Sequence, residues 1–312
     1  MASVALVFPG QGSQQVGMGR ALFEASAAAR AIFEAADDAL GMSLSTMCFE
    51  GPEDALVQTA NTQPAILTCS VAALAALRER LSITPTVVLG HSLGEFSALV
   101  AAGALRFGDA VRLVRLRGQA MQEAVPQGTG AMAAIIGLPV EELDALCAEA
   151  AQGEVVSPAN ENGGGQIVVA GHAAAVDRLV ALAKSRKARA VPLKVSAPFH
   201  CALMAPAAQR LAQALADVQV AAMGVPVIAN VDAQPNADAA AVKDLLVRQV
   251  TQRVRWEASV LRACELGVDT AIEVGHGKVL TGLVKRIAPS LTMHCCGSPA
   301  DIDVLNGAHV GA

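Results

Sequence analysis

Aromatic side chains are scarce in this sequence of 312 residues, which holds no Tyr, one Trp and seven Phe. Proteins that bind single-stranded nucleic acid stack the bases on aromatic rings, so this scarcity argues against that function. Charged residues are also few, at 16%, and the formal net charge is −5. A negative protein disfavours a polyanion recognised over the whole surface, although a local basic patch is compatible with these numbers.

Long apolar runs are missing as well, and no segment approaches the roughly 18 uninterrupted apolar residues of a membrane span. Residues Met1–Ser3 lead straight into the apolar run Val4–Phe8, without the basic region or cleavage site of a signal peptide. The seven Cys are odd in number and scattered, apart from Cys295–Cys296. This usage indicates reduced thiols and favours neither a disulfide framework nor a metal cage. We therefore expect a cytoplasmic protein with no bound metal.

The hydrophobic content of 53% indicates a well-buried globular chain, long enough for one large domain or a large domain with an insert. Strand-like and helical segments alternate along it, which predicts an α/β fold. Between residues 128 and 196 the order becomes β-α-β-β-α-β, the ferredoxin-like pattern. We predict a hydrolase-like main domain of residues 1–127 and 197–312 with a parallel sheet, and an inserted ferredoxin-like subdomain of residues 128–196.

Two segments are expected to be irregular. Asn160–Gly165 contains three consecutive glycines and is predicted to be a flexible inner loop of the subdomain. The tail after Pro299 is expected to be loose, as chain ends often are.

The most informative stretch joins a short apolar run, Val87–Leu89, to the apolar helix start Phe96–Ala101 through the sequence Gly90–Glu95. A buried strand, a turn with Gly on either side of one Ser, and a helix make up a G-x-S-x-G nucleophile elbow. The glycines let strand and helix pack closely, so the Ser92 hydroxyl is exposed above the sheet. The N–H of Leu93, at the helix N-terminus, is placed to donate to an oxyanion. The alternative is a Gly-rich turn whose Ser caps a helix.

A nucleophilic Ser needs a base, and His200 is the leading candidate among the six His. It ends the loop Ser196–Phe199, which Pro198 stiffens, and a rigid loop can hold an imidazole in the orientation that a base requires. A satisfied structural histidine is the alternative. His91 is adjacent to the Ser at a tight turn, so we expect it to line the site. His276 lies among glycines at a strand end and is a further plausible site position.

The orienting acid of a hydrolase triad is not evident in the sequence. An α/β-hydrolase places Asp or Glu between Ser and His, but no carboxylate in that interval has a distinctive context. Something other than a carboxylate is therefore expected to orient the imidazole. The predicted helix Phe107–Glu123 carries Arg112, Arg115 and Arg117. Arginines at this spacing usually form a solvated face, and the spacing does not say whether one turns inward towards a charged substrate.

Five short motifs occur in one order along the chain. They are Phe8–Gln14, Gly90–Glu95, Arg117, Ala197–His200 and Glu273–Gly275. Together they resemble the malonyl-CoA:acyl carrier protein transacylases of bacterial fatty acid synthesis, and related acyltransferase domains, over roughly residues 3 to 295. The inserted ferredoxin-like subdomain also fits that family.

The resemblance implies a role for each matching residue. Ser92 would carry malonyl as an ester, His200 would be its base, and Arg117 would pair with the free malonyl carboxylate through its bidentate fork. A main-chain carbonyl would orient the imidazole, and a count back from Trp256 assigns it to Gln249, with Gln252 close by. The N–H groups of two residues would form the oxyanion hole: Gln11 and Leu93. The expected substrate contacts are His91, Met121, Phe199, Asn160 and Asn162. Those of Asn160 and Asn162 would be to coenzyme A, from a segment that is unusually Gly-rich here.

The resemblance also implies the reaction and its partners. Malonyl-CoA and the phosphopantetheine thiol of an acyl carrier protein would be the two substrates of a ping-pong transfer that needs no cofactor, catalysed by a monomer. Carrier proteins are acidic, so a basic cluster is a candidate docking surface; one such cluster comprises Lys184, Arg186, Lys187 and Arg189, and a solvated helix end is the alternative. The rival functions are a serine hydrolase such as a thioesterase, a catalytically silent carrier-binding scaffold, and an acyltransferase of polyketide synthesis or malonate decarboxylation.

Overall fold

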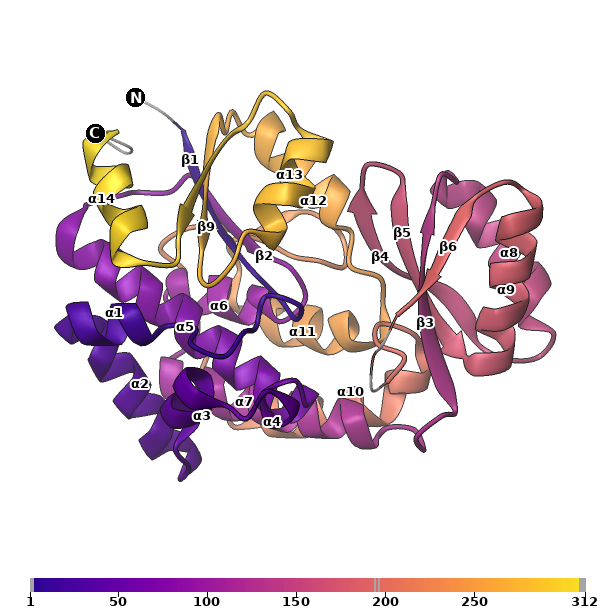
Figure 1. Cartoon of the computed structure of the whole chain (residues 1–312), viewed down its shortest axis with the longest axis horizontal. Coiled ribbons are helices and arrows are strands. Elements are labelled where there is room, and N and C mark those ends of the chain that lie inside the picture. The colour runs from indigo at the N-terminus through magenta and orange to yellow at the C-terminus, as the bar shows by residue number, and fades with distance from the viewer. Residues whose placement is uncertain (1–2, 194, 196, 309–312) are drawn as a thin grey trace.

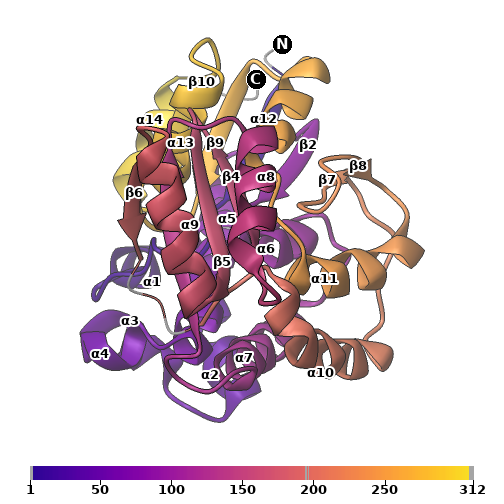
Figure 2. The same cartoon turned by 90° about the vertical axis from the view of Figure 1, so that its right-hand side faces the viewer.

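The computed structural model describes residues 3–193, 195 and 197–308. Figures 1 and 2 show a large body that holds both chain ends and a smaller body formed by the middle of the sequence. Each body is built on its own sheet, one with six strands and one with four. The predicted α/β class is confirmed.

The six-stranded sheet has the strand order β10-β9-β1-β2-β7-β8. All neighbours in this order pair in parallel except β8, which is antiparallel to β7. The predicted parallel sheet is therefore mixed at one edge. The strands are β1 (Val4–Phe8), β2 (Val87–Gly90), β7 (Val227–Ile228), β8 (Pro235–Asn236), β9 (Thr270–Val274) and β10 (Thr292–Cys296).

Helices cover both faces of this sheet because successive side chains of a strand point to opposite faces. Val4, Leu6 and Phe8 of β1 pack into one core, while Ala5 and Val7 pack into the other. The helices whose buried side chains share the core on the first face include α1 (Arg20–Ala25), α2 (Ala27–Leu40), α3 (Leu44–Glu50), α4 (Glu53–Leu56), α5 (Thr59–Arg80), α6 (Gly94–Ala101), α7 (Phe107–Glu123), α10 (Ala205–Ala216) and α11 (Val242–Thr251). Against the second face lie α12 (Trp256–Glu265) and α13 (Val279–Ile287), and short 3₁₀ turns span Ala202–Met204 and Ala239–Ala241.

Helix α5 is the central helix of the larger core. It is the one helix of the described chain long and apolar enough to cross a membrane, and 89% of its apolar window is buried inside the fold. Such burial is typical of the core helix of a folded domain. Pro64 lies inside this helix and has no N–H to donate to the carbonyl four residues earlier, at Ala60. That carbonyl instead accepts a hydrogen bond from Arg115 at 2.9 Å.

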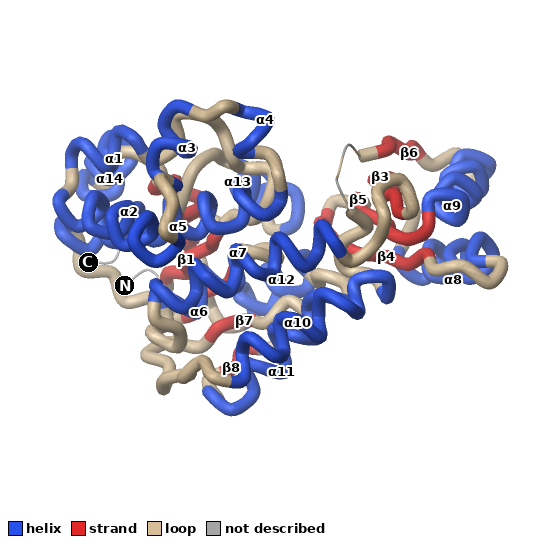
Figure 3. The backbone as a smooth tube through the Cα atoms, turned by 90° about the horizontal axis from the view of Figure 1, so that it is seen from below, coloured by secondary structure: helices blue, strands red, loops and turns tan. Residues whose placement is uncertain are grey.

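The four-stranded sheet is antiparallel, with the order β4-β5-β3-β6. The chain builds it in the predicted order from β3 (Gly130–Ile136), α8 (Val140–Ala151), β4 (Val156–Gly163), β5 (Gln166–His172), α9 (Ala173–Ser185) and β6 (Arg189–Pro192). Ala133 and Ile135 of β3 pack against α8 and α9, whereas Met132 and Ala134 belong to the core of the large body. The open face of this sheet is therefore turned towards the main body. Figure 3 shows α7 and α10 lying side by side in the main body and running towards the smaller body.

The predicted inner loop is mostly strand. β4 continues to Gly163, so only Gly164 and Gly165 remain as a turn before β5. The segment is extended in spite of its glycines because β4 is hydrogen-bonded along both of its edges. It forms a ladder with β5, and Val254 adds main-chain hydrogen bonds from the other side, to the Ala159 carbonyl and from the Glu161 N–H.

The expectation of a loose tail is wrong for most of its length. Pro299–Gly307 forms helix α14, with a proline in the first turn and Ser298 as its N-cap. The Ser298 side chain accepts a hydrogen bond from the Asp301 N–H, a typical start signal for a helix. Ile302 and Leu305 are buried in the main core, which ties the helix down.

The division into domains remains our proposal. The four-stranded sheet and its helices fall within residues 130–192, inside the predicted subdomain of residues 128–196. The last strand of the subdomain is Arg189–Pro192. The predicted return point at Ser196 lies outside the described residues, as does Lys194.

Candidate active site

Ser92 lies in a sharp turn between β2 and α6. Its φ of 50° is left-handed, which is rare and strained for a residue with a side chain. The flanking glycines are required by close packing: a Cβ on Gly90 would lie 2.0 Å from the Gly94 carbonyl carbon, and a Cβ on Gly94 would lie 2.1 Å from the Phe8 carbonyl oxygen. The strand, the turn and the helix therefore form the geometry of a nucleophile elbow.

His200 contacts the Ser92 hydroxyl. Its Nε2 lies 2.7 Å from Ser92 Oγ, and its Nδ1 lies 2.8 Å from the main-chain carbonyl oxygen of Gln249. A carbonyl only accepts, so Nδ1 must carry the proton and Nε2 is left to accept from the hydroxyl. Burial, and then the nearby Arg117 charge, lower the pKa of His200 to about 3. The imidazole is therefore neutral at physiological pH, the form that a base needs.

Arg117 is the buried arginine of the three on α7, with 2% of its surface exposed. One guanidinium nitrogen donates to Gln63 Oε1 at 2.7 Å, and the other donates to Gln249 Oε1 at 2.9 Å and to Ser92 Oγ at 3.2 Å. Burial lowers its pKa to about 10, so it remains a cation at neutral pH. The fork thus points at the same hydroxyl as His200 does.

The other two arginines differ from Arg117 and from each other. Arg112 is exposed and pairs with Asp109 at 3.1 Å, as expected of a solvated face. Arg115 is only half-buried, and it donates to the carbonyl of Ala60 and to Asn61. The expectation of a solvated face therefore holds for Arg112 and is wrong for Arg115, because Pro64 leaves a helix carbonyl for it to bind.

A cavity of about 210 Å³ opens above the Ser92 hydroxyl. Ten of the eleven residues predicted for the site line it; Gln249 lies beneath it instead. The lining consists of Gln11, Gln63, His91, Ser92, Leu93, Arg117, Met121, Met132, Asn160, Asn162, Val168, Leu193, Val195, Phe199 and His200.

The two residues predicted to donate to the oxyanion, Gln11 and Leu93, both line the cavity with Ser92. Gln11 comes from the loop after β1 and Leu93 from the first turn after the elbow, so both originate at the carboxyl ends of neighbouring parallel strands. The side chain of Gln11 donates to Thr59 Oγ1 at 3.3 Å. Donation by the two main-chain N–H groups to an oxyanion stays a prediction.

The predicted coenzyme contacts come from the smaller body. Asn160 and Asn162 project from β4 into the cavity, and Asn162 Oδ1 lies 2.9 Å from His91 Nε2. Burial lowers the pKa of His91, and a neutral imidazole can donate this hydrogen bond. His91 therefore links the elbow to the second sheet. His276 does not line this cavity and lies 3.4 Å from Gln15 Oε1.

No cluster of metal-ligating side chains occurs within residues 3–193, 195 and 197–308. The chemistry of the cavity is that of a neutral Ser–His pair beside a fixed cation. Such a pair can attack an acyl group, and the cation can bind an anionic one.

Two comparisons define the family. The profile of the acyl transferase domain matches residues 5–295. The malonyl CoA-acyl carrier protein transacylase of Salmonella typhimurium is 50% identical over 301 residues, which cover 96% of this chain and 97% of the relative. The chain belongs to the acyl transferase domain family.

Solved structures agree with this assignment. An acyl carrier protein S-malonyltransferase from Vibrio cholerae matches this acyl transferase with a TM-score of 0.95 and 49% identity, covering 97% of this chain and 100% of that one. A malonyl-transacylase in complex with a type II polyketide synthase acyl-carrier protein matches with a TM-score of 0.95 and 45% identity, covering 98% and 100%.

The site of this acyl transferase includes polar residues that sequence reasoning missed. Asn230 follows β7 and clamps the elbow: its Oδ1 accepts from the Ser92 N–H at 2.7 Å and its Nδ2 donates to the Gly90 carbonyl at 2.7 Å. A polar residue at the carboxyl end of the strand beside β2 was the signal that could have identified it. Gln63 carried no such signal, because it lies inside helix α5.

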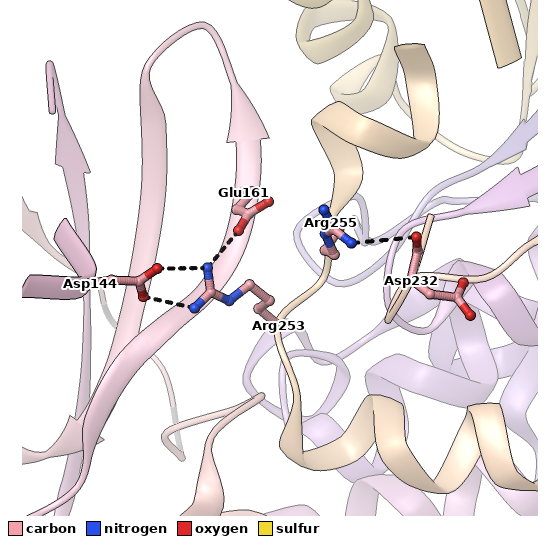
Figure 4. A network of polar contacts seen from close by, with 5 residues as sticks. All are labelled: Asp144, Glu161, Asp232, Arg253 and Arg255. Atoms are coloured by element: carbon pink, nitrogen blue, oxygen red, sulfur yellow. Dashed lines mark hydrogen bonds and ion pairs between the residues drawn. The ribbon is translucent and has the colours of Figure 1, made fainter. Parts of the chain in front are cut away.

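An ion-pair cluster joins the two bodies of the acyl transferase behind the site (Figure 4). Arg253 follows α11 and bonds Asp144 of α8 at 2.7 Å and Glu161 of β4 at 2.9 Å, while Arg255 donates to the Asp232 carbonyl at 3.5 Å. Together with the main-chain bonds of Val254, these contacts hold β4, which carries Asn160 and Asn162, against the segment that follows the Gln249 carbonyl.

Proposed function

We propose that this chain transfers malonyl from malonyl-CoA to the phosphopantetheine thiol of an acyl carrier protein, through a malonyl ester on Ser92. The observation that carries the proposal is the convergence on one hydroxyl: His200 Nε2 lies 2.7 Å and a guanidinium nitrogen of Arg117 3.2 Å from Ser92 Oγ. A base activates the hydroxyl for acyl transfer, and a buried cation selects an acyl group that carries a carboxylate.

In the first half-reaction, His200 accepts the Ser92 proton as Oγ attacks the thioester carbonyl. The Nδ1–H bond to the Gln249 carbonyl keeps the ring in place and stabilises the imidazolium that forms. The N–H groups of Gln11 and Leu93 stabilise the tetrahedral oxyanion. The C–S bond then breaks, the imidazolium returns its proton to the coenzyme A thiolate, and malonyl remains as an ester.

The second half-reaction runs the same steps in reverse. The carrier thiol gives its proton to His200, the thiolate attacks the ester carbonyl, and the proton returns to Ser92 Oγ as malonyl leaves on the carrier. Arg117 holds the malonyl carboxylate through both halves by two parallel hydrogen bonds. The remaining contacts to the acyl-pantetheine chain are proposed for His91, Met121, Phe199, Asn160 and Asn162, which line the cavity.

The carrier protein needs a docking surface, for which Lys184, Arg186, Lys187 and Arg189 remain the candidate cluster. These residues are exposed at the end of α9 and the start of β6, and Arg186 pairs with Glu142. Exposed basic side chains attract an acidic partner mainly by accelerating association. We further propose a cytoplasmic monomer, since one chain supplies every residue invoked in the two half-reactions.

Product analysis tests the proposed function against the hydrolase alternative. The enzyme is incubated with malonyl-CoA, with and without holo-carrier protein, and malonyl-carrier and free malonate are quantified. We expect malonyl-carrier as the main product and little malonate in either reaction, with both lost in Ser92→Ala. Malonate as the main product in the presence of carrier would identify a thioesterase.

A further inference from the structure

The carboxylate of Glu95 lies directly beneath the proposed reaction centre and takes no part in the steps above. It belongs to the first turn of α6 and is 2% exposed. Its Oε2 accepts from Gln249 Nε2 at 2.7 Å and from the Asn230 N–H at 3.0 Å. Both partners also contact the elbow, because Gln249 Nε2 donates to the Ser92 carbonyl at 3.0 Å.

The direction of these hydrogen bonds follows from Arg117, which can only donate. The amide oxygen of Gln249 must therefore face Arg117, at 2.9 Å. This orientation leaves the amide nitrogen to face Glu95, and the Asn230 N–H is a donor as well. Every hydrogen-bond partner of Glu95 within the described chain is thus a donor, which suits an ionised carboxylate.

Arg117 and Glu95, which Gln249 connects through its side-chain amide, carry opposite charges. The acceptors of Arg117 are Gln63, Gln249 and Ser92, all neutral, and no salt bridge of Arg117 exists among the described residues. Glu95 is one amide away and is the charged group whose attraction stabilises the Arg117 cation. A buried cation without a balancing charge is costly, so Glu95 balances the site.

We propose that Glu95 is the counter-charge of Arg117 in the free enzyme and exchanges that role with the malonyl carboxylate, so that the remaining ionised fraction of Glu95 becomes protonated as Ser92 becomes malonylated. This inference rests on the proposed function. A malonyl group would bring a second negative charge to one buried cation. Protonation of Glu95 by a proton from solvent restores neutrality, and the proton returns to solvent when malonyl leaves on the carrier thiol.

The exchange requires that Glu95 can gain and lose a proton near neutral pH, and its pKa lies in that range. Burial raises its pKa to about 7, against the lowering by Gln249, Asn230 and Arg117, while Asp232 raises it further. The other titratable groups nearby, His91 and His200, are kept neutral because burial lowers their pKa. A malonyl carboxylate bound to Arg117 offsets the positive charge that attracts Glu95, and it repels the Glu95 carboxylate. The pKa of Glu95 therefore rises above 7 on malonylation. At pH 7 the carboxylate then goes from about half protonated to almost fully protonated.

Proton uptake during a single turnover tests the proposal. The enzyme is mixed with malonyl-CoA in weakly buffered solution at pH 7 with an indicator dye, and uptake is divided by the acyl-enzyme measured by intact mass. We expect an uptake approaching about half a proton per malonyl-enzyme. We expect none for acetyl-CoA, which adds no charge, and none for Glu95→Gln, which keeps an acceptor oxygen of the same shape. Protons released by ionisation of the free coenzyme A thiol contribute equally to the reactions with malonyl-CoA, with acetyl-CoA and with the variant. This contribution therefore cancels when the proton uptakes are compared.

Infrared difference spectra of the wild-type enzyme provide a second readout that needs no variant. With ¹³C-labelled glutamate in the protein, malonylation at pH 7 should increase one labelled carboxylic-acid band and decrease one labelled carboxylate band, and acetylation should change neither. A malonyl adduct formed without proton uptake, or with equal uptake in Glu95→Gln, would overturn the inference and leave the proposed function intact. Absence of the malonyl adduct in the wild type would instead refute the proposed function, and the exchange with it.

Discussion

At the scale of single residues, the site combines side chains that are far apart in the sequence. Ser92 and His200 were recognisable because each lies in a local pattern, a glycine-flanked turn and a proline-stiffened loop. Asn230 and Glu95 were not assigned, since their roles depend on contacts across 135 or more positions. A local sequence pattern can identify a residue that lies in an unusual turn or loop. It cannot identify a residue that contacts the site only after distant segments have folded together.

Arg117 is expected to set the preference for malonyl over acetyl. With acetyl bound, its buried charge gains no carboxylate partner, so the two substrates differ in the transition state by a bidentate charged pair. Arg117→Ala should lower kcat/KM for malonyl-CoA by about 10²-fold or more and narrow the malonyl/acetyl ratio, with Ser92 still reactive. Arg117→Lys should recover only part, because an ammonium lacks the planar fork. The measurement is kcat/KM for both acyl-CoAs.

Arg112→Ala is the matched control for that series. It removes an arginine from the same helix whose side chain is exposed and pairs with Asp109, so both kcat/KM values should stay close to the parent. Arg115 is less suitable, since it holds the carbonyl of Ala60. An Arg117→Ala enzyme that still chose malonyl as strongly as the parent would move the carboxylate site elsewhere.

His200 is expected to stay neutral, with its proton on Nδ1, from pH 8 down to about pH 5. Its pKa of about 3 lies below the ordinary value, so the folded protein resists protonation while the unfolded chain accepts a proton below about 6.5. The neutral ring therefore contributes stability above pH 6.5, and this contribution is lost as the pH falls towards 3. ¹⁵N NMR of the imidazole, assigned with His200→Gln, measures the state directly; a cationic ring at pH 6 would contradict the assignment.

At the scale of elements, periodicity was a good guide where packing and local signals agree. The helix Phe107–Glu123 has the bounds that the sequence predicts, and the strands and helices of the subdomain occur in the predicted order. The errors occurred where tertiary contacts decide. Asn160–Gly165 reads as a loop from its glycines, but Val254 pairs with β4 and extends it, and α14 forms because its apolar side chains reach the core.

The elbow itself should tolerate no Cβ at its glycines. Gly94→Ala would place a methyl group 2.1 Å from the Phe8 carbonyl oxygen, and backbone on both sides would have to move. We expect a loss of about 1–3 kcal/mol in the free energy of unfolding and a steep fall in the acylation rate. Gly282→Ala in α13 is the control, because its Cβ meets nothing within 4 Å; it should stabilise by about 0.5–1 kcal/mol. Urea unfolding of both variants provides the comparison, and a Gly94→Ala protein as stable as the parent would contradict it.

At the scale of the whole molecule, the alternation of strands and helices predicted two bodies of the right kind. It did not predict how they meet, because the junction depends on contacts between segments far apart in the sequence. These include the Arg253 ion pairs, the Val254 main-chain bonds and the His91–Asn162 hydrogen bond. The cavity exists only in that junction. The nucleophile elbow and Arg117 belong to the larger body, whereas Asn160 and Asn162 of β4 belong to the smaller one. The substrate site therefore requires both bodies.

The central claim is that Ser92 carries malonyl between two thiols, and a chase of the isolated acyl-enzyme tests it most directly. The enzyme is acylated with malonyl-CoA, freed of coenzyme A, and mixed with holo-carrier protein, and both proteins are followed by intact mass. We predict that the malonyl mass on Ser92 disappears at the rate at which malonyl-carrier appears. In His200→Ala both half-reactions should be slower by about 10²–10⁴-fold. A carrier that stays unmodified while the ester persists or is hydrolysed to malonate would contradict the account.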